Sequence, residues 1–147
     1  MYNTKNIHNK LKHLSSTDWA YLAGFLDGYG SIIAQIVKRS DYKFGFMIKI
    51  SINFYQHKKR HWFILSLYKL LNKYGYIRIR NDNVSEYTIV QKDIVKEILI
   101  NVYKYSLAKK NLIKLVINII DSLDKVNNKS DFLKVCELVD KVAEFTD

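Results

Sequence analysis

Ten residues in the first quarter of the chain, Leu22 to Ser31, combine glycines and one acid in a pattern that could do chemistry. Gly24 and Gly28 are four residues apart, which puts them on one face of a helix. Glycine inside a helix costs about 1 kcal/mol relative to alanine, so this pair indicates that another backbone packs closely against that face. Asp27 lies near the helix end, where its charge opposes the helix dipole and calls for a cation or a local hydrogen bond. A capped helix with an incidental acid is the alternative.

Metal-binding and hydrolase patterns are otherwise weak in this sequence. The four histidines do not form a ligand spacing with Cys136, which is the one cysteine. His57 and His61 could share a helix face, but no third ligand follows them, so we do not expect zinc. Ser31 and Ser51 have no obvious His or Asp partner, and a catalytic triad is therefore not expected.

The charge balance indicates a polyanionic partner. Lys and Arg number 24 against 14 Asp and Glu, which gives a net charge of +10. Such an excess suits nucleic acid or an acidic membrane surface. No run of about 18 apolar residues occurs, so we expect no membrane span and no membrane partner. Lys outnumbers Arg by 20 to 4, and Ile, Asn and Tyr are abundant. We interpret this as the codon bias of an AT-rich genome and expect a mitochondrial or other organellar protein, although a lysine-rich soluble surface would look similar.

Periodicity and turn residues predict the elements that must position these side chains. Apolar residues make up 48% of the 147 residues, which is enough for the core of one domain. Ser16, Thr17 and Asp18 can cap a first helix, which ends at the glycines of the motif. Strands are predicted over 31–38, 46–55, 76–80 and 85–90, and further helices over 58–73, 92–103, 109–123 and 131–143. We expect residues 1–17 to form a basic flexible arm and residues 18–147 to form a single domain.

The stretch LAGFLDGYGS, from Leu22 to Ser31, resembles the motif of the LAGLIDADG homing endonucleases, specifically the short single-motif members that act as homodimers. The resemblance extends over residues 18–143 and is carried by SIIAQI at 31–36, YKF at 42–44, QHKKRHWF at 56–63, GYIR at 75–78, VSEY at 84–87, LVINII at 115–120 and FLKVC at 132–136. It implies an α+β fold in the order αββαββα with closing C-terminal helices. The four-stranded antiparallel sheet of this family forms a saddle that lies along a DNA major groove.

The resemblance also implies which residues face the groove and which join two subunits. The groove face would carry Ile33, Gln35, Val37, Lys49, Ser51, Asn53, Arg78, Arg80 and Glu86. Arginine suits guanine edges or phosphates, and Gln or Asn suits adenine. For each of these residues the alternative is a solvated position on an ordinary sheet. Two motif helices would pack against each other through Leu22, Ala23, Gly24, Leu26 and Asp27.

Tyr29 departs from the family pattern. Cleaving members have an acid at this position, which by resemblance binds the divalent metals, and Mg²⁺ prefers carboxylate and water oxygens. A neutral phenol with a pKa of about 10 is a poor substitute. Asp27 and the carbonyl of Gly28 remain from a degenerate metal site, but the family uses the Asp27 position mainly to shape the helix end. We therefore expect no cofactor, or Mg²⁺ if the protein is an active endonuclease.

Three further residues match the family's active site. Gln56, Arg60 and Lys109 correspond to residues that surround the scissile phosphate and position water. They could hold a nucleic-acid backbone without any metal, because Arg and Lys pair strongly with phosphate. A polar strand end and a solvated helical turn are the alternatives for Gln56 and Arg60.

Retained phosphate contacts and a lost acid predict a nucleic-acid-binding protein that no longer cuts. We favour structured RNA, such as organellar ribosomal RNA or intron RNA, bound by a structural or maturase-like component, together with other ribonucleoprotein components. The main alternative is an active or DNA-binding LAGLIDADG homing endonuclease that recognises a long DNA target, including an inactive subunit paired with an active one. A degenerate reading frame or a transcriptional regulator that still binds DNA is the third possibility.

Overall fold

The motif helix α1 (Ser16–Tyr29) begins at a capping box in the computed structural model, which describes residues 9–145. The hydroxyl of Ser15 accepts a hydrogen bond from the N–H of Asp18, and the Asp18 carboxylate accepts one from the N–H of Ser15. These bonds satisfy donors that the first turn of a helix leaves open. At its other end α1 passes directly into the first strand at Gly30, whose N–H donates to the carbonyl of Leu26.

The remaining elements are two pairs of strands separated by a helix and followed by three helices. They are β1 (Gly30–Lys38), β2 (Phe46–His57), the 3-10 turn η2 (Lys58–Arg60), α2 (His61–Leu70), β3 (Tyr76–Ile79), β4 (Val84–Ile89), α3 (Lys92–Val102), α4 (Lys110–Leu123), α5 (Lys129–Asp140) and the 3-10 turn η3 (Lys141–Phe145). The predicted α+β fold, with the order αββαββα and two closing helices, is confirmed. The predicted helix over 58–73 is shorter at both ends, because its first turn is a 3-10 helix and Asn72 and Lys73 adopt left-handed φ angles of 55° and 60°.

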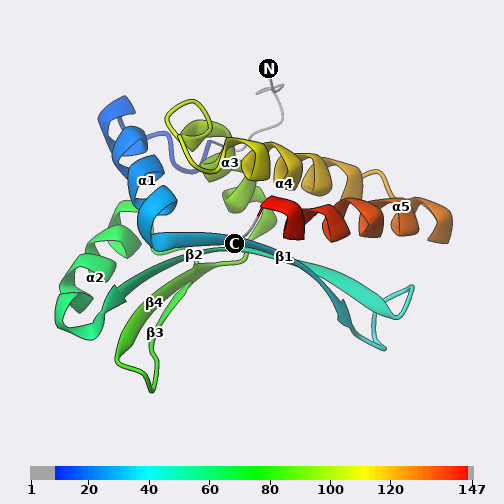
Figure 1. The fold of residues 1–147 in the computed structure, drawn as a ribbon, viewed down its shortest axis with the longest axis horizontal. Helices are drawn as coiled ribbons and strands as arrows, with labels where there is room; N and C mark the ends of the chain where they lie inside the picture. Colours follow the sequence, from blue (N-terminus) through cyan, green and yellow to red (C-terminus); the bar gives the residue numbers. More distant parts are fainter. Residues whose placement is uncertain (1–8, 146–147) are drawn as a thin grey trace.

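The four strands form one antiparallel sheet in the order β1-β2-β4-β3. Gly30 pairs with Phe54 across β1 and β2, and Phe54 pairs in turn with Tyr87 on β4. The sheet is arched, and α1, α3, α4 and α5 lie over its convex side while its concave side stays uncovered (Figure 1). Alternate residues of each strand therefore point into the core or onto the open face.

The core lies between the convex side of the sheet and the helices above it. Ile52, Phe54 and Tyr87 are fully buried on the strands, and they pack with apolar residues of the helices. The Tyr87 hydroxyl donates to the carbonyl of Tyr74, and burial raises the pKa of Tyr87 above its usual range. No helix within residues 9–145 is long and apolar enough to cross a membrane.

The segment before α1 differs from the prediction of a flexible arm over residues 1–17. Leu11 and Leu14 are buried, and the backbone N–H groups of Lys10 and Leu11 donate to the Glu97 carboxylate at 2.8 and 2.7 Å. Lys10 also pairs with Asp93 at 2.7 Å, which holds the pKa of that carboxyl below its ordinary value. Residues 9–15 therefore belong to the folded domain, while residues 1–8 of the predicted arm lie outside the described residues.

Gly75, just before β3, packs closely against β4, and Gly45, between β1 and β2, is a matched control because both glycines have left-handed backbone. Gly45 (φ +78°) has open space where a Cβ would lie, whereas a Cβ on Gly75 (φ +85°) would overlap the backbone of Thr88. We expect Gly45→Ala to lower the free energy of unfolding by about 1–2 kcal/mol, which is the cost of the φ angle alone. Gly75→Ala should cost about 3 kcal/mol or more, because overlap adds to strain. Urea unfolding followed by tryptophan fluorescence measures both, and equal losses would contradict the account of Gly75.

Candidate nucleic-acid interface

The open concave side of the sheet, called here the saddle face, carries polar residues from all four strands. The strand register places on it Ser31, Ile33, Gln35 and Val37 from β1, Met47, Lys49, Ser51, Asn53 and Tyr55 from β2, Glu86 and Thr88 from β4, and Tyr76 and Arg78 from β3. The groove-face residues predicted from the sequence thus share one surface, apart from Arg80, which follows β3 directly. Their contact with nucleic acid stays a prediction.

Some of these side chains are engaged with one another. The amide nitrogen of Asn53 donates to the hydroxyl of Ser51 at 3.0 Å, and the Thr88 hydroxyl lies 2.9 Å from the Asn53 amide oxygen. All three residues are buried. The side chains of Gln35 and Lys49 are exposed and make no hydrogen bond or ion pair within residues 9–145. The exposed pair is therefore free to meet a ligand, whereas Ser51 and Asn53 hold the sheet surface together.

Glu86 holds Arg78 of the saddle face and the adjacent Arg80, which follows β3. Its side chain is 11% exposed, and its oxygens lie 3.6 Å from Nε of Arg78 and 3.5 Å from Nη1 of Arg80. Arg80 also pairs with Asp82 at 2.8 Å and lies over the ring of Tyr55. The guanidinium groups are consequently held at the surface, with donors left over for an anionic or polar ligand.

The residues that match the family's active site lie around the end of α1. Because Gly30 pairs with Phe54, the motif ends beside the last residues of β2, which include Gln56. The hydroxyls of Ser31 and Tyr55 are 3.0 Å apart across this junction. Arg60 follows in η2 and is exposed. Strand pairing thus places two of the three phosphate-holding candidates at this end of the saddle.

Asp27 is fully engaged by the turn that precedes α4. One carboxylate oxygen accepts from the hydroxyl of Ser106 at 2.6 Å. The other accepts from the backbone N–H groups of Leu107 at 2.7 Å and Ala108 at 3.1 Å. Lys109, the third candidate, comes directly after this turn and is therefore tied to the motif helix.

The residues at the end of the motif do not fit a divalent metal. The Tyr29 side chain is exposed and its ring lies against Phe25, so a phenol occupies the position of the family's acid. Both carboxylate oxygens of Asp27 already accept hydrogen bonds from Ser106, Leu107 and Ala108. The backbone carbonyl of Gly28 alone is a poor ligand for a divalent metal. Within residues 9–145 no group of three His, Cys, Asp or Glu residues could hold a metal ion. A second copy of the chain would bring the same phenol and the same engaged carboxylate.

The predicted dimer interface needs correction at three positions. Leu22, Ala23 and Leu26 are 0% exposed, since they form the stripe of α1 that faces the core. They cannot reach a partner helix. Gly24 and Gly28 lie on the exposed side of α1, and a Cβ on either would meet open space.

Exposed apolar residues beside this glycine stripe escaped the sequence analysis. Tyr21 on α1 is 54% exposed, and Trp62 and Leu65 on α2 are 65% and 39% exposed. Phe63 joins them into one surface, because its ring contacts those of Tyr21 and Trp62 edge to face. The three-residue spacing of Trp62 and Leu65 was a usable signal for an apolar stripe on the outside of α2.

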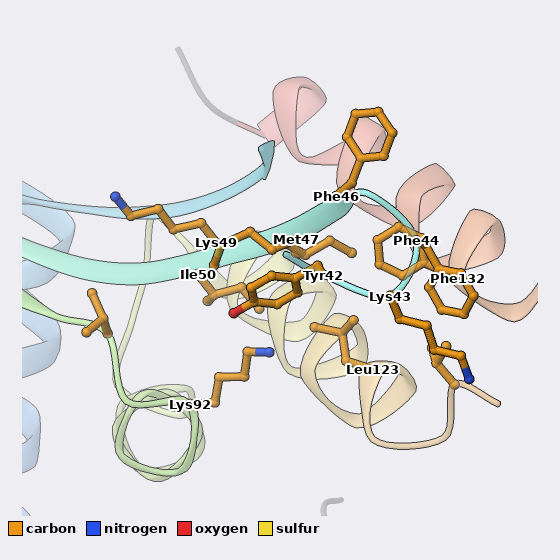
Figure 2. A pocket seen from close by; sticks show the side chains of 13 residues that line it. Tyr42, Lys43, Phe44, Phe46, Met47, Lys49, Ile50, Lys92, Leu123 and Phe132 are labelled. Atoms are coloured by element: carbon orange, nitrogen blue, oxygen red, sulfur yellow. The ribbon is translucent and has the colours of Figure 1, made fainter. Parts of the chain in front are cut away.

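A hollow of about 600 Å³ lies at the far end of the saddle (Figure 2). Consecutive residues of β2 from Phe46 to Ile50 line it, because the pairing of β2 with β4 stops at Ile52 and leaves the strand edge open. Lys43, Lys49 and Lys92 stand around this hollow. Lys43 and Lys92 thus add positive charge next to Lys49 of the saddle face.

Comparison with known proteins places these features in a family context. A family model described as LAGLIDADG endonuclease matches residues 22–114. The chain is 35% identical to the DNA endonuclease I-CvuI of Chlorella vulgaris over 142 residues, which cover 97% of this chain and 84% of that protein. It is 35% identical to the DNA endonuclease I-CreI of Chlamydomonas reinhardtii over 128 residues, which cover 86% and 77% of the two chains.

Solved structures agree with this relationship. A crystal structure of I-CvuI bound to an I-CreI target in the presence of Mg has a TM-score of 0.82 and 34% identity, and the match covers 97% of this chain and 86% of that one. The homing endonuclease I-TnaI has a TM-score of 0.74 at 18% identity, covering 90% and 95%, and shows the shared fold alone.

Replacing Glu86 by Gln tests whether this carboxylate restrains the arginines of the saddle face. Gln keeps the shape and an acceptor for Thr88 but removes the charge that attracts Arg78 and Arg80. We expect Glu86→Gln to elute from immobilised heparin at higher salt than the wild type. Asp124→Asn, at the exposed end of α4, makes the same charge change away from the saddle and should shift elution less. Equal shifts would show that Glu86 does not restrain the arginines.

Proposed function

The chain belongs to the LAGLIDADG endonuclease family, and from this premise we propose that it binds a long double-stranded DNA target along its saddle face as a homodimer. Two relatives that match most of the chain are named DNA endonucleases, and one is solved with its DNA target. These relatives favour DNA over the structured RNA predicted from the sequence, and nothing in them supports a ribosomal or maturase-like role. DNA is therefore the partner that we propose.

The saddle face supplies the chemistry for DNA recognition. An antiparallel ribbon fits the major groove, where guanidinium groups read guanine and amides read adenine. The exposed Gln35 and Lys49 and the restrained Arg78 and Arg80 provide such groups. The single observation that carries the proposal is this set of exposed donors on an uncovered concave sheet in a chain of net charge +10.

Dimer formation would complete the interface. Helices approach closely where small residues face each other, and Gly24 and Gly28 present such a stripe. The exposed Tyr21, Trp62 and Leu65 beside it would be buried by a second copy. Two subunits would place two saddle faces along one duplex, and each would contribute its own positive charge to the phosphate backbone.

Cleavage is the part of the family's activity that this chain supports least. Hydrolysis by divalent metals needs anionic ligands beside the phosphate, and Mg²⁺ would supply Lewis-acid activation of water where it binds. Tyr29 and the engaged Asp27 do not provide those ligands. We propose that the protein binds DNA and cuts it poorly or not at all, while Gln56, Arg60 and Lys109 hold the backbone at the motif end.

Selection from randomised pools tests the choice of partner. Duplex DNA with a long randomised segment and a structured RNA pool of equal length are selected in parallel against the wild-type protein. We expect one enriched DNA sequence that binds at least about 10³-fold more tightly than the unselected duplex at physiological salt. An RNA bound more tightly than any selected DNA would contradict the proposal and restore the RNA hypothesis.

Substitution at Tyr29 tests whether that residue limits cleavage. On the selected duplex with Mg²⁺, we expect Tyr29→Asp to cut at least about tenfold faster than the wild type, because a carboxylate can hold the cation that a phenol cannot. Tyr29→Phe is the matched control; it removes only the hydroxyl and should not cut faster. A wild type that makes double-strand breaks as fast as Tyr29→Asp would show that the protein is an active endonuclease.

A further inference from the structure

Asp27, the first acid position of the motif, makes structural contacts that do not involve a metal. Asp27 reaches across about 80 residues of sequence to the turn before α4, where it accepts three hydrogen bonds from Ser106, Leu107 and Ala108. The side chain of Leu107 is 91% exposed, so burial of that side chain does not hold the turn in place. Charge-assisted hydrogen bonds are the stronger kind, and here they fasten the turn to the end of α1.

Electrostatics favour the carboxylate at this point. The helix dipole of α1 disfavours an acid in the last turn of the helix, and no basic residue in that turn offsets this effect. The N–H groups of Leu107 and Ala108 precede α4 (Lys110–Leu123), and the amino-terminal end of that helix carries partial positive charge. The dipole of α4 and the three hydrogen-bond donors therefore offset the unfavourable dipole of α1 at Asp27.

Ser106 connects Asp27 to the backbone of Lys109. Its side chain is fully buried, and its hydroxyl donates to Asp27 while accepting from the N–H of Lys109 at 3.1 Å. The carbonyl of Lys109 accepts from the N–H of Ile113 at 2.8 Å, which begins α4. The backbone of Lys109 is therefore fixed on one side by the helix and on the other by the motif.

From these contacts we propose that Asp27 is a positioning residue, which through Ser106 sets Lys109 against the phosphate backbone beside the end of the motif. The proposal rests on the proposed DNA binding. It assigns the two acid positions of the motif separate tasks. In cleaving members of the family the acid at the position of Tyr29 binds the metal ion. Asp27 instead positions Lys109, and this role does not depend on cleavage.

Removing the Asp27 charge should weaken binding, although an acid is lost. Asp27→Asn leaves one carbonyl oxygen for three donors, so hydrogen exchange at the Leu107 and Ala108 amides should speed up. Affinity for the selected duplex should fall about three- to tenfold. The slope of log affinity against log salt should drop by about one, as it should for Lys109→Ala, because one phosphate contact is lost. Asp124→Asn makes the same charge change at an exposed site and should leave affinity equal or slightly higher.

The double variant separates positioning from a general structural effect. If Asp27 acts through Lys109, the double variant Asp27→Asn with Lys109→Ala loses no more affinity than Lys109→Ala alone. Additive losses, or unchanged exchange at Leu107 and Ala108, would overturn the proposal. Ser106→Ala keeps both charges and should reproduce the salt slope of Asp27→Asn if the latter folds poorly.

Failure of the proposed function would be visible separately. It would appear in the wild type, as absence of selective DNA binding, whereas failure of the positioning role appears only on comparing variants. Immobilised heparin, a simple polyanion, then supplies the same double-variant comparison. Non-additive losses of heparin affinity would support the positioning role, and additive losses would overturn it.

Discussion

The direct passage from α1 into β1 at Gly30 is the constraint on which the arrangement of the interface depends. A Cβ at this residue would lie 3.0 Å from the backbone carbonyl oxygen of Asn53 on β2, which is tighter than an ordinary contact, so the absence of a side chain at Gly30 favours this close approach of helix and strand. That closeness puts Tyr29 and Asp27 at the edge of the saddle face. Loss of the close approach would displace the motif from the strands that form the saddle face.

The placement of functional groups explains how binding and cutting can separate in one scaffold. In the proposed DNA binding, the contact would be shared by exposed donors spread over the sheet, among them Lys49 and the arginines paired with Glu86. Metal-dependent cutting needs a few anionic ligands at one place, and Tyr29 supplies no carboxylate at the motif end. Under the proposed function, a single substitution at the motif end would weaken cutting, whereas DNA binding would weaken only gradually as residues of the saddle face change.

Local patterns were enough to predict the order of strands and helices and to divide the residues of each strand between two sides, because alternation in a strand fixes which residues share a side. The resemblance to the family was needed to say which side is the open one. Local patterns did not show that Leu22 points inward and Gly24 outward, since either side of α1 carries apolar or small residues. The tie between Leu11 and Glu97 joins segments more than 80 residues apart, and local pattern carries no sign of it. The choice of DNA needed relatives, because both nucleic acids are polyanions. An organellar origin stays a prediction.

The open edge of β2 near Phe46 has a consequence for the behaviour of the free protein. An unpaired strand offers backbone donors and acceptors to any other chain, and proteins usually blunt such edges with lysine. Lys43, Lys49 and Lys92 surround this edge and repel the same edge of a second molecule. Concentrated salt would screen that repulsion, so we expect edge-to-edge association of the free protein to increase with ionic strength.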